Sequence, residues 1–259
     1  MGSCRPFSEA DTYLQSLAVA GCIADTSFLI AVTDKDNHFY DDAQFLFEKL
    51  VEYQIPIFVT VTARAEFIDF HRRVIITETL MDMLASASKW KISSAVRDVL
   101  KSQKGWIDNQ ARDGSDPYLP DFRIKKCKQV FSPKTQSGQI GWVELCKEYL
   151  SGRLIVAWTD IAEALSLNYV DMRADGSKEF FRKDLKWEDM CRVAEESALG
   201  SNDAMILNLL DSSIFPFVVT ADYDLAYGVL LSTKDKTALI PDGVYRNHVK
   251  KLRFGALPN

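Results

Sequence analysis

The sequence predicts an α/β protein with a three-layer α/β/α core, built on a mostly parallel sheet, and a mostly helical insertion. Three observations predict this fold. Short, almost continuously apolar runs at residues 21–25, 55–61 and 214–220 are typical of strands buried on both faces. Segments with helical spacing of apolar residues adjoin these runs, as in β-α-β units. Between about residues 71 and 187 helical spacing and turns replace the strand-like runs.

The first part of the chain is expected to contain two β-α units. Residues 21–25 form the first strand, and apolar residues from about 39 to 54 recur at the spacing of a crossover helix. Residues 55–61 form the second strand, where Pro56 is tolerated because it lies at the strand start. Thr62 can then cap a helix that contains Glu66.

The middle of the chain is expected to be helical and rich in loops. Helical spacing predicts helices near residues 75–84, 92–100, 142–150 and 160–167, with turns or loops at 113–120 and 171–186. We therefore expect a core formed by residues 1–70 and 188–259, and a mostly helical insertion or lid formed by residues 71–187.

The last part of the chain returns to the α/β pattern. Gly200 can end one helix, and the next begins at residues 201–203, which places Asp203 in its first turn. The strand at 214–220 is followed by a turn that contains Asp222 and by a helix that ends near Leu231. Residues 237–240 complete the sheet as its last strand.

Composition excludes several classes of protein. The 259 residues carry a net charge of -5, so a nucleic acid would have to be bound by a local basic patch. The five cysteines are odd in number and widely spaced, which argues against a disulfide framework or a zinc site. The three histidines are isolated, so a histidine-based triad has little support. Because no apolar stretch is long enough to span a membrane, we expect a soluble cytoplasmic protein without a membrane partner.

Four acidic residues fall where a parallel strand would pass into its helix: Asp25, Glu66, Asp203 and Asp222. The carboxyl ends of parallel strands line one crevice, so residues far apart in the chain can meet there. Four carboxylates in one crevice repel each other unless cations lie among them, and hard oxygen ligands suit Mg²⁺ or Mn²⁺. The sequence therefore predicts a metal site. Paired divalent ions could neutralise a phosphate, activate water and stabilise the leaving oxygen of a phosphodiester.

Four short motifs resemble the PIN domain, a family of metal-dependent nucleases that includes the VapC-type toxins. They are IADTSFL at residues 23–29, TARAEF at 62–67, NDAMIL at 202–207 and VTADYD at 219–224, in the order of the family. The resemblance covers roughly residues 20–70 and 188–245. The large insertion departs from the compact toxins, and the substrate is not carried over.

The resemblance implies a fold and a set of roles. A strand-ending Asp, a Glu on the next helix and two later Asp residues hold one or two divalent ions in that family, and activated water cuts the phosphodiester. The corresponding residues are Asp25, Glu66, Asp203 and Asp222, with Asp25 and Asp222 as the main direct ligands. Glu66 is also a candidate to orient the water. The family's small polar residue corresponds to Thr26 or Ser27 and its strand-ending threonine to Thr220; both would support the ligands.

Further residues are candidates from their positions in the sequence. Asp69 and Asp224 lie close to the expected ligands and could join a second metal, although capping or ion pairing also explains them. Among four basic clusters, we favour Arg64, Arg72 and Arg73 as phosphate contacts because they adjoin the expected crevice. RNA is the expected partner, while a homodimer and an inhibitor protein remain open.

Two functions follow from these patterns. The first is a divalent-metal-dependent endonuclease, expected to act on RNA. The alternative is a catalytically inactive PIN-like module that binds RNA or a protein. Phosphoryl transfer on another doubly wound fold has less support, because Ser27 stands where a dehalogenase-type site needs a second Asp.

Overall fold

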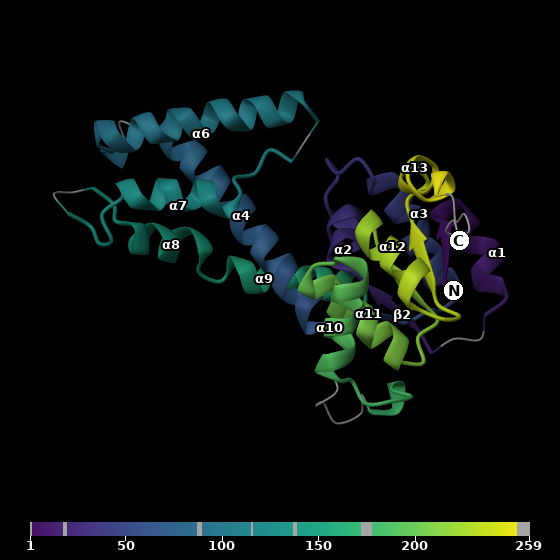
Figure 1. The fold of residues 1–259 in the computed structure, drawn as a ribbon. Coiled ribbons are helices and arrows are strands. Elements are labelled where there is room, and N and C mark those ends of the chain that lie inside the picture. Colours follow the sequence, from purple (N-terminus) through teal and green to yellow (C-terminus); the bar gives the residue numbers. More distant parts are fainter. Residues whose placement is uncertain are drawn as a thin grey trace, which may run out of the picture. The chain divides into compact units, whose positions relative to one another are not determined.

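A computed structural model describes residues 2–17, 20–86, 90–114, 116–136, 139–171 and 178–252. Its strands form one all-parallel sheet of six in the order β1-β6-β5-β2-β3-β4, which confirms the expected α/β class (Figure 1). The strands are β1 (Ser3–Pro6), β2 (Cys22–Ala24), β3 (Ile57–Val59), β4 (Asn168–Tyr169), β5 (Phe217–Val219) and β6 (Thr237–Ile240).

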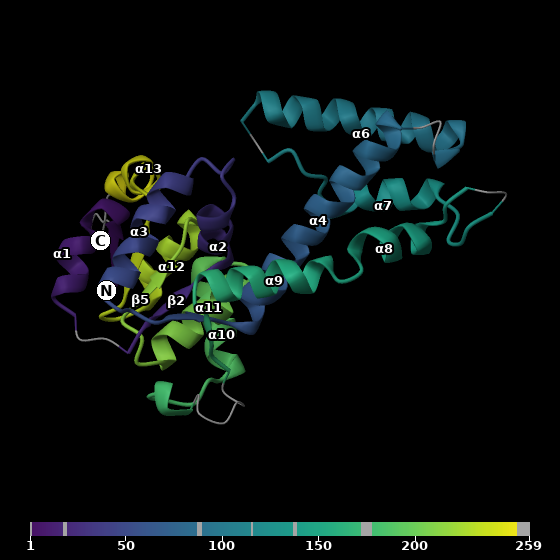
Figure 2. The same ribbon diagram turned by 180° about the vertical axis from the view of Figure 1, so that it is seen from behind.

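Helices cover both faces of the sheet, which gives the three-layer arrangement (Figures 1 and 2). Parallel strands require right-handed crossovers, so connections that run in opposite directions along the sheet place their helices on opposite faces. One layer contains α1 (Ala10–Gln15), α2 (Thr26–Thr33) and α3 (Tyr40–Glu52), and the other contains α10 (Trp187–Ser197), α11 (Ser201–Ser212) and α12 (Tyr223–Ser232). The short helix α13 (Asp242–Asn247) follows β6, and single 3-10 turns lie at Phe7–Glu9, Lys178–Phe180 and Val249–Lys251.

The central strands end at the same level of the sheet. Ala24 at the end of β2 pairs with Val59 on one side and with Val219 on the other. All three residues of β2, β3 and β5 are buried, as their continuous apolar runs predict. The residues that follow these strands therefore emerge along one edge, where the candidate acids are expected.

The chain divides into two compact units, and each has its own core. The first comprises residues 1–67 and 160–259, and the second comprises residues 68–159. The sequence pattern instead predicts that residues 160–187 belong to the insertion. They fall in the first unit because β4 pairs with β3, and because Phe180 packs on Phe215 beside β5. Ile23, Phe58 and Val218 belong to the core of this unit.

The second unit is helical within its described residues. It contains α6 (Ser94–Arg112), α7 (Asp121–Val130) and α8 (Trp142–Leu150), while α4 (Val61–Ala85) and α9 (Arg153–Ala164) cross its boundaries. Buried apolar side chains form its core, among them Ile76, Leu80, Leu100, Leu119 and Trp142. No helix in the described ranges is long and apolar enough to cross a membrane.

Helix α4 differs from the expectation. Separate helices are expected around Glu66 and at residues 75–84, but one helix runs without a break from Val61 to Ala85. No Gly or Pro interrupts this segment, so nothing in its backbone chemistry ends the helix earlier. Its start is capped by Thr60, whose hydroxyl accepts from the Ala63 N–H at 3.1 Å, and not by Thr62.

Candidate functional site

The order of the strands places the site at a switch in chain direction. From β2 the chain moves outward to β3 and β4 on one side, and then returns to β5 and β6 on the other side. In open α/β sheets, ligands bind outside the carboxyl ends of the strands at such a switch point. Here the switch lies between β2 and β5, and Asp25 and Asp222 follow these two strands.

Asp25 is held in one orientation by its neighbours. It caps α2, is 4% exposed, and its main-chain N–H donates to the Val219 carbonyl at 3.0 Å. One carboxylate oxygen, Oδ2, accepts from the Ser27 hydroxyl at 2.6 Å and from the Thr220 hydroxyl at 2.9 Å. Burial raises the pKa of Asp25, these hydrogen bonds oppose the rise, and the charge of Glu66 adds to it.

The hydroxyls of Ser27 and Thr220 also connect the two sides of the switch point. The Ser27 Oγ accepts from the Ala221 N–H at 2.8 Å, and the Thr220 Oγ1 accepts from the Asp222 N–H at 2.9 Å. Their oxygens lie 3.0 Å apart. Each hydroxyl thus fixes Asp25 and the chain after β5 at the same time, which gives both residues a positioning role.

Glu66 is reached by donors from two other elements. It lies in the second turn of α4 and accepts from the Thr26 hydroxyl at 2.8 Å. It also accepts from the side-chain amide of Asn202, which lies in the first turn of α11. Glu66 therefore links the starts of α2, α4 and α11.

Asp203 shows that the four acids share one electrostatic environment. It lies in the first turn of α11, and Gly200 before this helix offers no capping side chain. Burial raises the pKa of Asp203 to about 7, and nearby negative charges contribute to the rise, in decreasing order those of Asp25, Asp222, Glu66 and Asp224. Carboxylates from four separate segments of the chain therefore act on one another, as their sequence positions predict.

Asp222 caps α12 and lies beside a second acid. Its Oδ1 accepts from the Asp224 N–H at 2.8 Å. Burial raises the pKa of Asp222, this hydrogen bond opposes the rise, and the charges of Asp224 and Glu66 add to it. Asp224 itself is exposed, so it contributes charge from the rim of the cluster.

Asp25, Glu66, Asp203 and Asp222 form what we call the carboxylate cluster. Hydrogen bonds from Ser27 and Thr220 orient Asp25, and those from Thr26 and Asn202 orient Glu66. The oxygen donors suit Mg²⁺ or Mn²⁺, and Mg²⁺ normally keeps several waters and few direct carboxylates. The oxygen donors of the cluster would suit a divalent ion that keeps part of its water shell.

The other predicted residues are placed differently. Asp69 belongs to the second unit, where it pairs with Arg72 at 2.7 Å and with Arg73 at 3.4 Å. Arg72 also pairs with Asp121 at 2.5 Å. These ion pairs give Asp69, Arg72 and Arg73 structural partners within the second unit. Arg64 belongs to the first unit, and its charge opposes a rise in the pKa of Tyr169 that burial causes.

The contact from Asn202 to Glu66 is not predicted from the sequence. Asn202 stands directly before Asp203 in the third motif, but at a helix start an asparagine is usually explained by capping. Its side chain instead orients an acid 136 positions earlier in the chain. Only the pairing of strands that brings α4 and α11 together could have revealed it.

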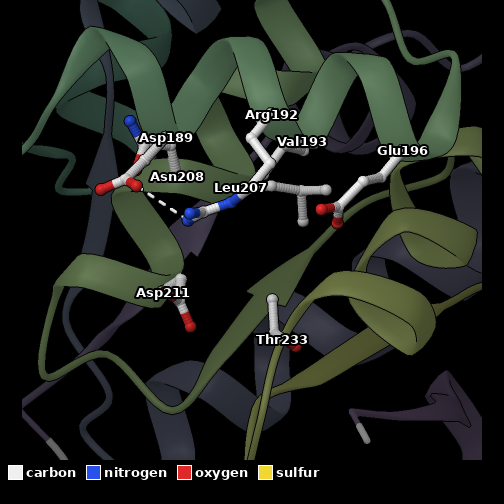
Figure 3. Close-up of a pocket in the computed structure, with 8 residues that line it drawn as sticks. All are labelled: Asp189, Arg192, Val193, Glu196, Leu207, Asn208, Asp211 and Thr233. Carbon is white, nitrogen blue, oxygen red and sulfur yellow. Dashed lines mark hydrogen bonds and ion pairs between the residues drawn. The ribbon is translucent and has the colours of Figure 1, made fainter.

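A separate cavity lies away from the carboxylate cluster. Its volume is about 50 Å³, and it is lined by Asp189, Arg192, Val193, Glu196, Leu207, Asn208, Asp211 and Thr233 (Figure 3). Arg192 pairs with Asp189 at 2.7 Å, and Asp211 pairs with Lys183 at 2.6 Å. Such a volume holds a few water molecules and is too small for a nucleotide. None of the four clustered acids lines it, so it is not part of the candidate site.

Comparisons of the chain with protein-family models, with curated proteins and with solved structures found no match. The geometry of the carboxylate cluster is therefore the main basis for a function. Its four acids lie at the end of the sheet where α/β proteins bind ligands, and they influence one another's ionisation.

Proposed function

We propose that the chain is a divalent-metal-dependent endonuclease that cleaves RNA, with a PIN-like α/β core. The observation that carries this proposal is the electrostatic coupling of Asp203 to Asp25, Asp222 and Glu66 at the switch point of the sheet. Buried acids that raise one another's pKa are costly unless a function uses them, and they are typical of catalytic sites.

In this proposal Asp25 and Asp222 bind Mg²⁺ or Mn²⁺ directly, while Glu66 and Asp203 bind it directly or through water. A bound ion would neutralise charge on the phosphate and lower the pKa of a coordinated water. Ser27 and Thr220 hold the Asp25 carboxylate in a fixed orientation, and Asn202 and Thr26 do the same for Glu66.

These donors limit how the acids can act. Because Thr26 and Asn202 both donate to Glu66, its carboxylate is held as an acceptor, and it can orient a water that approaches between α4 and α11. Burial and neighbouring acids raise the pKa of Asp203 to about 7, so it is partly ionised at neutral pH and in that form can accept a hydrogen bond from a water. The chain thus supplies orientation and negative charge, and the substrate supplies the phosphodiester.

The test is cleavage of a labelled RNA by the purified chain with Mn²⁺, with chelator, and by the Asp25→Asn variant. We expect chelator to abolish cleavage, and Asp25→Asn to lower it at least about a hundredfold while the fold is kept, because burial already favours the neutral form of this residue. Asp211→Asn is the control: it also removes one negative charge, but from α11 outside the cluster, and it should leave cleavage unchanged. Cleavage that survives both chelator and Asp25→Asn would refute the proposal.

A second candidate is an inactive PIN-like module that binds RNA or a protein. It is favoured by the absence, within the described residues, of a preformed group of three metal-ligating side chains. This candidate predicts that Mn²⁺ does not bind. Titration calorimetry separates the two, because saturable binding that is lost in Asp222→Asn would reject the inactive module.

A further inference from the structure

The two compact units carry opposite net charges. Residues 68–159 contain 15 Lys and Arg against 10 Asp and Glu, a net charge of +5, whereas the rest of the chain contains 16 against 26, a net charge of -10. The total of -5 therefore conceals a basic helical unit. A basic unit in an acidic chain is typical of a local nucleic-acid surface.

Ion pairs show which of these basic residues are compensated. Arg72 and Arg73 lie against Asp69 and Asp121, and Lys104 pairs with Asp108 at 3.0 Å. On α7, by contrast, Lys125, Lys126 and Lys128 are exposed, and none of them enters an ion pair with any described residue. Asp121, the one acid of α7, is bound to Arg72. Lys125 adds a coulombic effect on Asp121, but the exposed charges of these lysines have no ion-pair partner among the described residues.

Helix α7 also exposes an aromatic ring among these lysines. Phe122 is 56% exposed, whereas Ile124 and Cys127 on the opposite side of the helix are buried. Lys125, Lys126 and Gln129 follow Phe122 by three, four and seven positions, the spacing of one helix face. We call Phe122, Lys125, Lys126 and Gln129 the α7 basic face; Lys128 is exposed at its edge.

Cations also surround the exposed ring. The Lys126 ammonium lies 5.9 Å from the ring centroid of Phe122, and the Arg123 guanidinium lies 5.5 Å from it. Arg123 is itself fixed, because it stacks over Trp106 at 4.4 Å and donates to Gln103 at 2.8 Å. The ring is therefore presented from a rigid helix beside positive charges, the combination that stacks on a base and holds the adjoining phosphates.

We propose that the α7 basic face binds single-stranded RNA, with the lysines on phosphates and Phe122 stacked on an unpaired base. A duplex keeps its bases stacked on one another, so the exposed ring favours a single strand. A helix of 10 residues with one exposed aromatic side chain is a weak membrane anchor. The choice of RNA rests on the proposed nuclease function, but binding does not need the carboxylate cluster.

The test is fluorescence anisotropy of a labelled single-stranded RNA with the full chain in chelator, where cleavage does not interfere. We expect Lys125→Gln with Lys126→Gln to weaken binding about tenfold or more and to lower the salt slope by about 1.4, because each phosphate contact contributes roughly 0.7. Phe122→Ala should weaken binding about tenfold with little change in the slope. The control removes Lys101 and Lys104 from α6 of the same unit and should stay within about twofold.

Three results would overturn the inference. Equal weakening by the α6 control would mean that bulk charge binds the RNA, and unchanged binding in both α7 variants would place the contact elsewhere. Light scattering measures self-association of the same variants. If the α7 variants lose self-association but keep RNA binding, the face would be assigned to a second copy of the chain. This outcome is separate from that of the nuclease proposal. RNA binding through α7 without Asp25-dependent cleavage would refute only the nuclease. Asp25-dependent cleavage, together with α7 variants that bind RNA as the wild type does, would refute only this inference.

Discussion

Replacing Asp203 by asparagine should stabilise the fold at neutral and alkaline pH in the absence of divalent ions. Burial and neighbouring acids raise the pKa of Asp203 from 3.8 to about 7. Between these values the folded chain binds more protons than the unfolded chain, so stability falls as the pH rises through this window. The full penalty is present above about pH 7 and disappears below about pH 4. Asp203→Asn removes it.

The size of the effect follows from the pKa shift. A rise from 3.8 to about 7 corresponds to at most about 4 kcal/mol at 1.36 kcal/mol per unit. The side chain is partly exposed, so solvent screening reduces this to about 1 to 2 kcal/mol. An acid in the first turn of α11 also gains roughly 0.5 kcal/mol from the helix dipole, which the variant loses. We therefore expect a net gain of about 1 kcal/mol at pH 8, which shrinks to zero or less at about pH 4.

Urea unfolding at both pH values with chelator measures this gain. Asp211→Asn is the matched control, because it neutralises an acid in the last turn of the same helix that pairs with Lys183, and it should be neutral or slightly destabilising. Adding Mn²⁺ at about pH 8 should make the wild type more stable than Asp203→Asn. An ion at 100 times its Kd stabilises the wild type by about 2.7 kcal/mol, and it stabilises Asp203→Asn by less. A stability difference that is the same at both pH values would refute the idea that Asp203 lies in a negative cluster.

Three further substitutions test the surroundings of the cluster and the fold. Ser27→Ala removes a hydroxyl that donates to Asp25 and accepts from a main-chain N–H, so urea unfolding should show a loss of about 1 to 2 kcal/mol; an unchanged midpoint would contradict this network. Asn202→Asp places a second acid against Glu66 and should lower the free energy of unfolding by about 1 kcal/mol at neutral pH. Thermal melts should show that the variant and the wild type become equally stable below about pH 4, where both acids are protonated. Lys236→Met leaves two buried carbonyls without their donor and should cost about 2 to 4 kcal/mol at pH 7. Because burial lowers the pKa of Lys236 to about 8, the wild type gains stability from about pH 8 to 10.5, so this deficit should grow over that range; a deficit that does not grow would contradict it.

The strands at the centre of the sheet could be predicted, whereas those at its edges could not. β2, β3, β5 and β6 are buried on both faces, so almost every residue is apolar and the runs stand out in the sequence. β4 has only two residues and both are exposed, so neither length nor pattern marks it. Edge strands adopt their conformation through pairing with a neighbouring strand. This is a tertiary effect, so the local sequence pattern does not predict it.

Parts of the candidate site follow from the same patterns. Asp25, Asp203 and Asp222 could be placed because each follows a strand or opens a helix, and parallel strands bring such positions to one edge. The partners of the basic residues could not be placed in this way. Arg72 meets Asp121 across 49 positions, and this contact depends on how α4 and α7 pack. The sequence therefore favours Arg72 as a phosphate contact, while the folded unit gives it an acid as its partner.

Asp25 and Glu66 are held by a different kind of donor from several carboxylates outside the cluster. Within the described residues, Asp69, Asp189 and Asp211 each lie against an arginine or lysine, which compensates their charge. Asp25 and Glu66 are instead held by hydroxyl and amide groups, which fix the orientation of a carboxylate without neutralising it. A carboxylate that served only the fold would be more stable beside a cationic side chain than beside other acids. In the proposed function a divalent cation would compensate these acids, and stabilisation of the fold by Mn²⁺ that disappears in Asp25→Asn would be the most direct measure of it.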